Sequence, residues 1–203
     1  MSDTKTIQSN MGYVIFLSGA PGSGKTTATT FISSKLKCTV IHQDSYFLPN
    51  DKKPRIMLSN GKEYRNSDTI GALDMKKLNE DIIYARFHSN LVLVEGFCLT
   101  ENIMRVVPDM HIHLSFIDSE NKKDIFPLSN ISLLEKRILE TRKSYKHNLV
   151  NDELMVKDII VPFYLNNTES SKFTHIVPTF IGDNRISKEL VNARILDLIS
   201  SVL

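Results

Sequence analysis

The feature that most constrains the fold is the glycine-rich segment GAPGSGKT at residues 19–26. It follows the apolar run YVIFL at 13–17, which predicts a buried strand, and it leads into residues 25–36, whose apolar side chains have helical spacing. A strand that enters such a loop and leaves it as a helix is the setting of a phosphate-binding loop, GxxxxGK[ST]. The sequence therefore predicts a sheet whose first strand ends at an anion site.

Each part of this loop has a predicted role in holding nucleotide phosphates. The glycines let successive backbone N–H groups turn inward, and the N-terminus of the following helix adds its positive dipole. Lys25 is expected to reach the β- and γ-phosphates, and the Thr26 hydroxyl is expected to ligate Mg²⁺. We therefore predict ATP and Mg²⁺ as cofactors, with the nucleotide held by Gly19, Ala20, Pro21, Gly22, Ser23, Gly24, Lys25, Thr26 and Thr27.

Apolar runs and helical patterns alternate along the whole chain. The predicted strands are 13–17, 38–41, 91–94, 112–116 and 173–177, and the predicted helices are 25–36, 73–87, 131–145, 153–164 and 188–202. A continuous run such as LVLV favours a strand covered on both faces, as in a parallel sheet. The alternation predicts one α/β domain of βαβ units over residues 1–203, with ligands at the carboxyl ends of the strands.

Composition and charge place limits on the partners. The net charge of +2 is near neutral and argues neither for nor against a polyanionic partner. We expect small-molecule partners, among them ATP, and no nucleic acid. No apolar run approaches the ~20 residues that span a bilayer, so no membrane partner is expected. Residues 1–10 are polar and lack the apolar stretch of a signal peptide. We therefore expect a cytoplasmic protein that acts on small molecules, and the sequence does not indicate its oligomeric state.

A carboxylate stands at the end of two predicted strands. Asp44 follows the run at 38–41, and Glu95 follows LVLV. Because the carboxyl ends of parallel strands share one edge of the sheet, both acids are expected beside the phosphate loop. We predict that Asp44 accepts a proton from an acceptor hydroxyl, and that Asp44 and Glu95 join Thr26 as Mg²⁺ ligands. The alternatives are a solvated aspartate that caps a turn and an exposed strand-end glutamate.

Two short matches spell the motifs of a GTPase. Residues 68–71 match DxxG and residues 121–124 match NKxD. The first should leave a buried strand, but 61–67 is polar apart from Tyr64; the second should close an apolar strand, but three polar residues intervene. Motifs without their structural context are weak, so we interpret both matches as accidental.

Cationic and imidazole side chains supply two further candidate sites. Arg137 and Arg142 lie five apart on the predicted helix 131–145, on adjoining faces. We predict that both are catalytic arginines of a helical lid, at about 118–150, which closes over the transferring phosphate; the alternative is a solvated amphipathic face. His111 and His113 share one face of a strand and have no obvious third ligand, so we interpret them as strand residues rather than metal ligands.

Six segments occur in one order along most of the chain. They are GAPGSGKTT at 19–27, HQDSYF at 42–47, SDTIGALDMKKL at 67–78, VEGF at 94–97, EKRILETRKSY at 135–145 and IIVPFYLNN at 159–167. Together they resemble the nicotinamide riboside kinase and uridine–cytidine kinase group of P-loop kinases. The phosphate loop alone is common to many families, whereas QDSYF followed by ALDMKKL is more specific.

This resemblance implies a three-layer α/β/α fold with a five-stranded parallel sheet and an arginine-bearing helical lid. It implies transfer of the ATP γ-phosphate to the 5′-hydroxyl of a nucleoside. Asp44 matches the family's catalytic acid, and Asp68 matches the carboxylate that holds the ribose 2′- and 3′-hydroxyls. One carboxylate can accept from both hydroxyls of a cis-diol, so a sugar lacking one would leave an acceptor unpaired.

Some of these segments resemble one branch of this group and some resemble the other. SDTIGALDMKKL resembles the nicotinamide riboside kinase version, whereas Asp44-Ser45 resembles the uridine kinase pattern. Ser67 stands where the nicotinamide riboside branch usually has an aromatic residue that stacks on the base. Arginines are also fewer in the lid, with Ile138 and Leu139 in their place. We expect Tyr46, Phe47 and Tyr145 to contact the acceptor, and Tyr46, Tyr64 or Tyr145 to stack on its base.

Three hypotheses of function follow. The leading one is a nicotinamide riboside kinase-like nucleoside kinase, and the second is a uridine or cytidine kinase. The third belongs to another class, a nucleotide-binding regulatory protein of GTPase or pseudokinase type.

Overall fold

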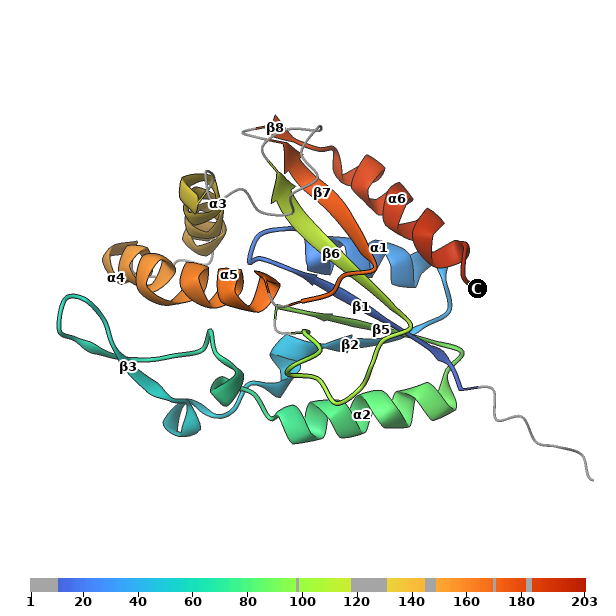
Figure 1. The fold of residues 1–203 in the computed structure, drawn as a ribbon, viewed down its shortest axis with the longest axis horizontal. Helices are drawn as coiled ribbons and strands as arrows, with labels where there is room; N and C mark the ends of the chain where they lie inside the picture. Colours follow the sequence, from blue (N-terminus) through green and yellow to red (C-terminus); the bar gives the residue numbers. More distant parts are fainter. Residues whose placement is uncertain (1–10, 98, 118–130, 145–148, 170, 182–183) are drawn as a thin grey trace, which may run out of the picture.

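In the computed structural model, which describes residues 11–97, 99–117, 131–144, 149–169, 171–181 and 184–203, a six-stranded sheet forms the centre of the molecule (Figure 1). Its strand order is β2-β5-β1-β6-β7-β8. The bounds are β1 Tyr13–Gly19, β2 Thr39–His42, β5 Leu91–Gly96, β6 Met110–Ile117, β7 His175–Ile181 and β8 Asn184–Arg185.

The first five strands are parallel, and β8 runs antiparallel to β7. The expectation of a purely parallel, five-stranded sheet was therefore wrong, because the sheet is mixed. The sixth strand consists of Asn184 and Arg185, which pair with Ile181 and Phe180. A polar dipeptide carries no apolar pattern, so the strand could not be recognised from the sequence.

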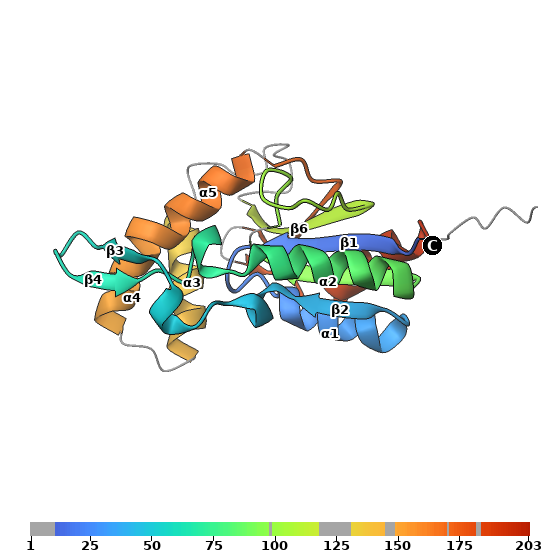
Figure 2. The same cartoon turned by 90° about the horizontal axis from the view of Figure 1, so that it is seen from below.

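Helices cover both faces of the sheet in three layers, as Figures 1 and 2 show. On one face α1 (Lys25–Lys35) and α6 (Lys188–Ser200) bury Ile32 and Ile195 against Ile15 and Leu17 of β1. On the opposite face α2 (Met75–His88) buries Leu78 and Ile82 against Val14 and Phe16. Successive side chains of a strand point to opposite faces, so β1 supplies both cores, as its continuous apolar run predicted.

Helices α2 and α6 start at polar side chains that cap their first turn. The Asp74 carboxylate accepts from the Lys77 backbone N–H, and the Ser187 hydroxyl accepts from the Leu190 N–H. An N-cap of this kind satisfies one of the donors that a helix leaves free at its start. Both helices lie within two residues of the ranges that the sequence predicted.

The helix predicted at 153–164 is longer and is interrupted by a π turn. It consists of α4 (Leu149–Met155), the π segment Val156–Ile160 and α5 (Val161–Glu169). The Val161 N–H donates to the Val156 carbonyl, one residue further back than in an α-helix. Pro162 follows, and a proline ring clashes with the carbonyl four residues earlier, so the wider turn accommodates it.

Strand β7 was predicted at 173–177 and extends instead to Ile181. Pro178 lies within it, and a proline removes a donor from the ladder. The register between β6 and β7 shifts at this point, between Ser115 and Phe116. The Thr179 hydroxyl donates to the Ser115 carbonyl at 3.1 Å, which supplies a hydrogen bond beside the missing one. The strand therefore continues past a residue that ordinarily ends one.

Beyond the carboxyl ends of the strands lies a second layer of elements around the lid helix α3 (Ile131–Ser144) (Figure 1). A small antiparallel hairpin, β3 (Arg55–Met57) and β4 (Glu63–Arg65), lies in a region where the sequence predicted neither a strand nor a helix. Leu58 at its tip is buried in the cluster that joins α3, α4 and α5. The Ser59 N–H also donates to Asp158, so the hairpin and the lid helices form one unit.

Three 3₁₀ turns complete the fold, at Gln43–Tyr46, Asn50–Lys52 and Ile70–Ala72. Within the part of the chain that the structure describes, every helix is too short or too polar to cross a membrane.

Candidate active site

The phosphate loop connects β1 to α1, as the sequence predicted. Gly22 and Gly24 have φ of 81° and 95°, the left-handed region in which side chains other than glycine are strained. Gly24 is the N-cap of α1, so the first N–H groups of that helix face the loop. The Lys25 ammonium donates to the carbonyl oxygens of Gly19 and Ala20, each at 2.9 Å. Donors and a positive charge are thus gathered on one short loop, the arrangement that binds phosphate.

A buried polar chain lies directly behind this loop. The Ser18 hydroxyl is 2.7 Å from His111 Nε2 and 2.8 Å from His113 Nδ1. His113 Nε2 is 2.8 Å from the Tyr164 hydroxyl, which also hydrogen-bonds the Ala20 backbone. Burial lowers the pKa of His111 to about 4 and holds the pKa of His113 well below its usual value, so both rings are neutral. The two histidines therefore belong to the buried packing behind the loop, and their partner Tyr164 could not be recognised from the sequence.

The carboxylate of Glu95 contacts the first turn of α1. Its Oε1 accepts from the Thr26 hydroxyl at 2.8 Å, and its Oε2 is buried without a hydrogen-bond partner, 3.6 Å from His42 Nδ1. A buried carboxylate oxygen that lacks a partner is costly unless a cation or water satisfies it. Thr26 and Glu95 have the oxygen atoms that a Mg²⁺ ion prefers, and their role as metal ligands stays a prediction.

Asp44 shares this electrostatic environment. Burial raises its pKa, while the Lys25 and His42 charges oppose that shift and Glu95 reinforces it. No three His, Cys, Asp or Glu side chains of the described residues converge on one point. A Mg²⁺ ion here would therefore depend on the Thr26 hydroxyl and phosphate oxygens besides the two carboxylates, which is usual for this ion.

Gln43 fixes the spacing of the two acids. It is fully buried, and its amide oxygen accepts from the Phe97 N–H at 2.9 Å, which ties the end of β2 to the end of β5. A Cβ at Gly96 would lie 2.4 Å from the same oxygen, so only glycine fits there. The distance between Asp44 and Glu95, at the ends of the neighbouring strands β2 and β5, is consequently constrained.

A cleft of about 480 Å³ opens between the phosphate loop, the hairpin and the lid. Both Asp44 and Asp68 line it, as do Lys25 and Thr26, so the predicted donor and acceptor residues meet in one space. The volume is in the range of small-molecule sites. Its remaining walls are Pro21, Gly22, Phe47, Arg65, Ser67, Glu95, Gly96, Phe97, Thr141, Arg142 and Met155.

Asp68 forms an ion pair with Arg142 of α3, the predicted lid helix. Arg142 donates to its Oδ2 at 3.0 Å, and the other arm of the same guanidinium reaches Asp152 at 3.3 Å. Burial raises the pKa of Asp68, and the Arg142 charge opposes that shift. The arginine therefore bridges the lid to the predicted ribose carboxylate, on the acceptor side of the cleft.

The predicted acceptor aromatics are not all together. Phe47 lines the cleft and stacks with Phe97, with ring centroids 6.3 Å apart. The hydroxyl of Tyr46 instead donates to Asp81 on α2 at 2.8 Å, so this side chain is engaged away from the cleft. Tyr64 packs against the hydrophobic cluster of the lid helices. Tyr145 lies outside the described residues.

Arg137 and Arg142, predicted to act together, point to different places. The Arg137 guanidinium lies over the Phe180 ring, 4.3 Å from its centroid, and pairs with Glu140 at 2.8 Å. Arg137 and Phe180 border a hollow of about 310 Å³ beside Gly22, with Arg185 on its rim. Arg137 therefore borders this hollow, whereas Arg142 lines the cleft that contains Asp68.

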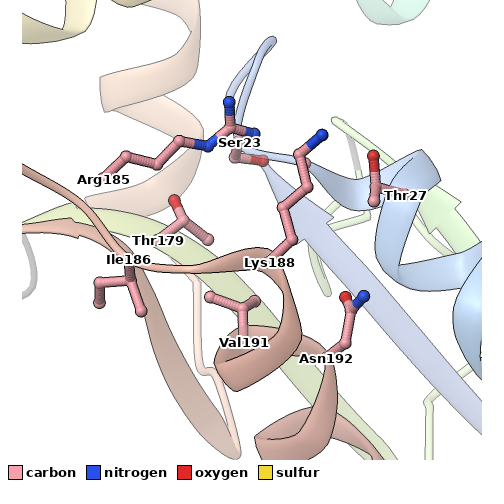
Figure 3. A pocket seen from close by; sticks show the side chains of 9 residues that line it. Ser23, Thr27, Thr179, Arg185, Ile186, Lys188, Val191 and Asn192 are labelled. Atoms are coloured by element: carbon pink, nitrogen blue, oxygen red, sulfur yellow. The ribbon is translucent and has the colours of Figure 1, made fainter.

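A smaller crevice continues along this side of the loop. Figure 3 shows Arg185 and Lys188 extending toward Ser23, while Thr27 faces them from α1. The crevice combines two cationic side chains with Thr179 and Asn192, both largely buried. It offers polar groups next to the phosphate loop, whereas Asp44 and Asp68 line the larger cleft.

The DxxG match does not lie in the structural setting that a GTPase motif requires. Asp68 precedes the 3₁₀ turn Ile70–Ala72, and the nearest strand before it, β4, belongs to the hairpin rather than to the central sheet. Residues 121–124 lie outside the described residues. The DxxG match is therefore a coincidence of spelling, as the sequence context indicated.

Comparisons with known proteins support the fold. No protein-family model and no curated protein matches the sequence. Among solved structures, a protein from Silicibacter sp. TM1040 described as a "putative fructose transport system kinase" has a TM-score of 0.53 at 14% identity, over 87% of this chain and 92% of that chain. At this identity the likeness shows the fold alone, a three-layer α/β fold.

Several residues of the cleft were missed by sequence reasoning. Phe97, at the end of VEGF, was assigned no role, although its ring stacks on Phe47. Asp152 and Lys53 come from segments without a motif, and the folded chain brings them against Arg142 and Ser67, which line the cleft. Sequence reasoning also missed Thr141. In the structure, a Cβ added to Gly22 would lie 2.2 Å from the Thr141 hydroxyl oxygen. The one available signal was Gln43, an amide within the HQDSYF segment between an apolar strand and a charged turn.

Proposed function

We propose that the protein is an ATP-dependent nucleoside kinase, which transfers the γ-phosphate of ATP to the 5′-hydroxyl of a nucleoside. The observation that carries the proposal is one cleft lined by a phosphate loop and by two carboxylates, Asp44 and Asp68. A regulatory nucleotide-binding protein needs the loop but has no use for a second carboxylate across the cleft. Nicotinamide riboside kinase-like chemistry is the leading form, and a uridine or cytidine kinase is the alternative.

The donor is held by the phosphate loop. ATP would supply the transferable phosphate, and Mg²⁺ would neutralise its developing charge. The loop N–H groups and Lys25 are placed to bind phosphate oxygens, and Thr26 with Glu95 to hold the metal. The hollow beside Arg137 and Phe180 suits the flat ring of a base, because a guanidinium and an aromatic ring both stack on such a ring.

The acceptor is positioned from the other side. Asp68 accepts hydrogen bonds from the ribose 2′- and 3′-hydroxyls, with Arg142 adding donors beside it. This grip directs the 5′-hydroxyl toward Asp44, which takes its proton as the oxygen attacks phosphorus. A general base needs to be ionised and within reach of the hydroxyl, and Asp44 lies next to the cations that favour ionisation.

The lid completes the site. Thr141 and Arg142 belong to α3, and both line the same cleft as the phosphate loop. A helix in this position excludes water from the phosphate, which prevents hydrolysis of ATP in place of transfer.

A direct assay tests the proposal. The purified protein is incubated with ATP, Mg²⁺ and nicotinamide riboside, uridine or cytidine, and the nucleoside monophosphate is quantified. We expect formation of a 5′-monophosphate that disappears in Asp44→Asn. Transfer to none of the nucleosides, with ATP still bound, would favour the regulatory class; a larger thermal shift with GTP than with ATP would favour a GTPase.

A further inference from the structure

Asp152 is a buried acid of the lid to which the proposed reaction assigns no role. It lies on α4, which packs against α3, and it is 6% exposed. Its Oδ1 accepts from Arg142 at 3.3 Å, whereas its Oδ2 is buried and, among the described residues, has no hydrogen-bond partner. An aspartate is rarely this buried unless it is paired, and an unsatisfied carboxylate oxygen is costly. A buried ion pair is weak evidence for stability, so the contact calls for another explanation.

Arg142 connects Asp152 to the cleft. One arm of its guanidinium donates to Asp152, and the other donates to Asp68 Oδ2 at 3.0 Å. Arg142 and Asp68 line the cleft. Met155, three residues after Asp152 on α4, lines it too, and side chains three apart share one face of a helix. Asp152 therefore lies on the cleft side of α4 and reaches the cleft through the guanidinium.

Arg137, on the same helix as Arg142, is held in a different way. It pairs with Glu140 of its own helix at 2.8 Å, and the Glu140 side chain is 46% exposed. The two acids at Arg142 come from other segments, and their side chains are only 15% and 8% exposed. Exposed ion pairs contribute little, whereas charge-assisted hydrogen bonds to buried acids fix the geometry of a side chain. The orientation of Arg142 is therefore set by its two acids.

Binding of a ribose would change the balance at this guanidinium. In the proposed reaction the 2′- and 3′-hydroxyls donate to Asp68, so they share its oxygens with Arg142. Asp152 does not belong to the lining of the cleft, so its contact with Arg142 stays in place. A planar guanidinium with one arm fixed keeps its other donors in a fixed direction. Arg142 can then remain beside Asp68 and direct donors at the hydroxyl oxygens.

We propose, resting on the nucleoside kinase function above, that Asp152 is a positioning residue, which holds Arg142 beside Asp68 and so prepares the ribose site. Without Asp152, Arg142 is a long side chain anchored by one acid, and ordering it when the nucleoside binds costs conformational entropy. Asp152 thereby acts on the affinity for the acceptor. It does not act on the phosphate loop or on proton transfer, because its contact with the cleft passes through Arg142.

Asp152→Asn tests this role. Asparagine has nearly the same shape and keeps one acceptor oxygen, but it loses the charge that strengthens the bond to Arg142. With ATP, Mg²⁺ and whichever of nicotinamide riboside, uridine and cytidine is phosphorylated best, the KM for the nucleoside should rise about tenfold. The kcat and the KM for ATP should stay close to the wild type. Glu153→Gln is the matched control, since Glu153 is the exposed neighbouring acid on α4, and none of the three constants should change.

A double-variant cycle shows whether Asp152 acts through Arg142. Arg142→Met should itself raise the KM for the nucleoside, because the guanidinium donors are lost. Adding Asp152→Asn to Arg142→Met should raise it no further, since no arginine is left to position. The second substitution should instead restore part of the stability, measured by denaturant unfolding, because it removes a buried carboxylate that has lost its cation.

Arg142→Lys is a second probe, which leaves Asp152 intact and serves if Asp152→Asn does not fold. Lysine keeps the positive charge, but its ammonium lacks the planar fork that bonds both carboxylates. The KM for the nucleoside should again rise about tenfold, with the KM for ATP unchanged. An unchanged KM for the nucleoside would show that the bridge between Asp68 and Asp152 is not needed, which overturns the inference.

The outcomes separate this inference from the function on which it rests. If none of the three nucleosides is phosphorylated, the kinase proposal fails and this one falls with it. If transfer depends on Asp44 but Asp152→Asn lowers only the free energy of unfolding, Asp152 is a structural residue and only the positioning inference is overturned. Equal rises in the KM for ATP and for the nucleoside, or additive rises in the double variant, would overturn it as well.

Discussion

The two halves of the site are assembled in different ways. The donor half is one continuous loop, from Gly19 to Thr26, whose conformation is set by its own glycines and by the strand and helix that flank it. The proposed acceptor half joins Asp44, Asp68, Phe97 and Arg142, which come from four separate segments. A local site tolerates change elsewhere in the chain, whereas a site of distant parts depends on every element that carries one.

This difference affects how each half can vary. The loop has little freedom, because Gly22 combines a positive φ with a close approach to Thr141. Single residues of the acceptor half can change without altering the fold, since each is a side chain on a different element. We therefore expect donor use to be a fixed property of the fold and acceptor choice to be a property of this particular chain.

The strongest test of this comparison removes the one residue that serves both halves. Asp44→Asn should lower kcat by about 10²–10⁴-fold, because the amide cannot accept the hydroxyl proton. ATP binding should stay close to the wild type, since the phosphate loop is unaltered. Steady-state kinetics and calorimetry with ATP measure the two effects.

Asp51→Asn is the matched control for that variant. Asp51 is exposed in the 3₁₀ turn Asn50–Lys52, so its amide should leave turnover unchanged. Near-normal turnover in Asp44→Asn would refute the assignment of the base. An equally large loss in Asp51→Asn would point to a general effect of the substitution.

The second test breaks the acceptor half alone. Asp68→Asn should raise the KM for the nucleoside by roughly 10–100-fold, because the amide has one acceptor in place of two and leaves Arg142 without this partner. The KM for ATP should change little. With a 2′-deoxynucleoside, the wild type should lose activity and the variant should lose far less, since the contact is already gone. Equal losses in both proteins would show that Asp68 does not hold the ribose.

The acidic side of the pH profile gives a third test. Burial raises the pKa of Asp44, so the carboxylate is lost at a higher pH than in an ordinary aspartate, whose pKa is about 3.9. Activity needs the ionised form and should fall about tenfold per pH unit below the raised pKa. The kcat/KM profile for the nucleoside should therefore bend above pH 4. An unchanged circular dichroism spectrum at each pH excludes unfolding, and a profile that stays flat down to pH 4 would contradict the assignment.

The sequence predicted the local half better than the assembled half. The loop, its flanking elements and Asp44 could be recognised because their signals lie within a few residues of one another. Five of the six strands of the sheet and its covering helices followed from apolar periodicity. The hairpin and the Lys53–Ser67 contact could not be predicted, since they depend on how 49–69 packs against the lid. The divergence of Arg137 and Arg142 agrees with their spacing of five residues, which places them on adjoining faces of α3.

The smallest expected effect tests whether the phosphate loop keeps its conformation without contacts from distant parts of the chain. Tyr164 lies on α5, far along the chain, yet its hydroxyl hydrogen-bonds both His113 and the Ala20 backbone. One assignment satisfies every group: the Ala20 N–H donates to the Tyr164 oxygen, the phenol donates to His113 Nε2, and the chain continues through Ser18. Tyr164→Phe would leave buried donors and acceptors without partners, at a cost of about 1–3 kcal/mol in the free energy of unfolding.

Because the lost partner belongs to the loop backbone, Tyr164→Phe should also raise the KM for ATP by roughly three- to tenfold while the KM for the nucleoside stays unchanged. Tyr84→Phe is the control, since Tyr84 is exposed on α2 and its hydroxyl has no buried partner to lose. Denaturant unfolding and steady-state kinetics separate stability from binding. A loss of stability with an unchanged KM for ATP would show that the loop keeps its shape without Tyr164, so that the donor half is local in energy as well as in sequence.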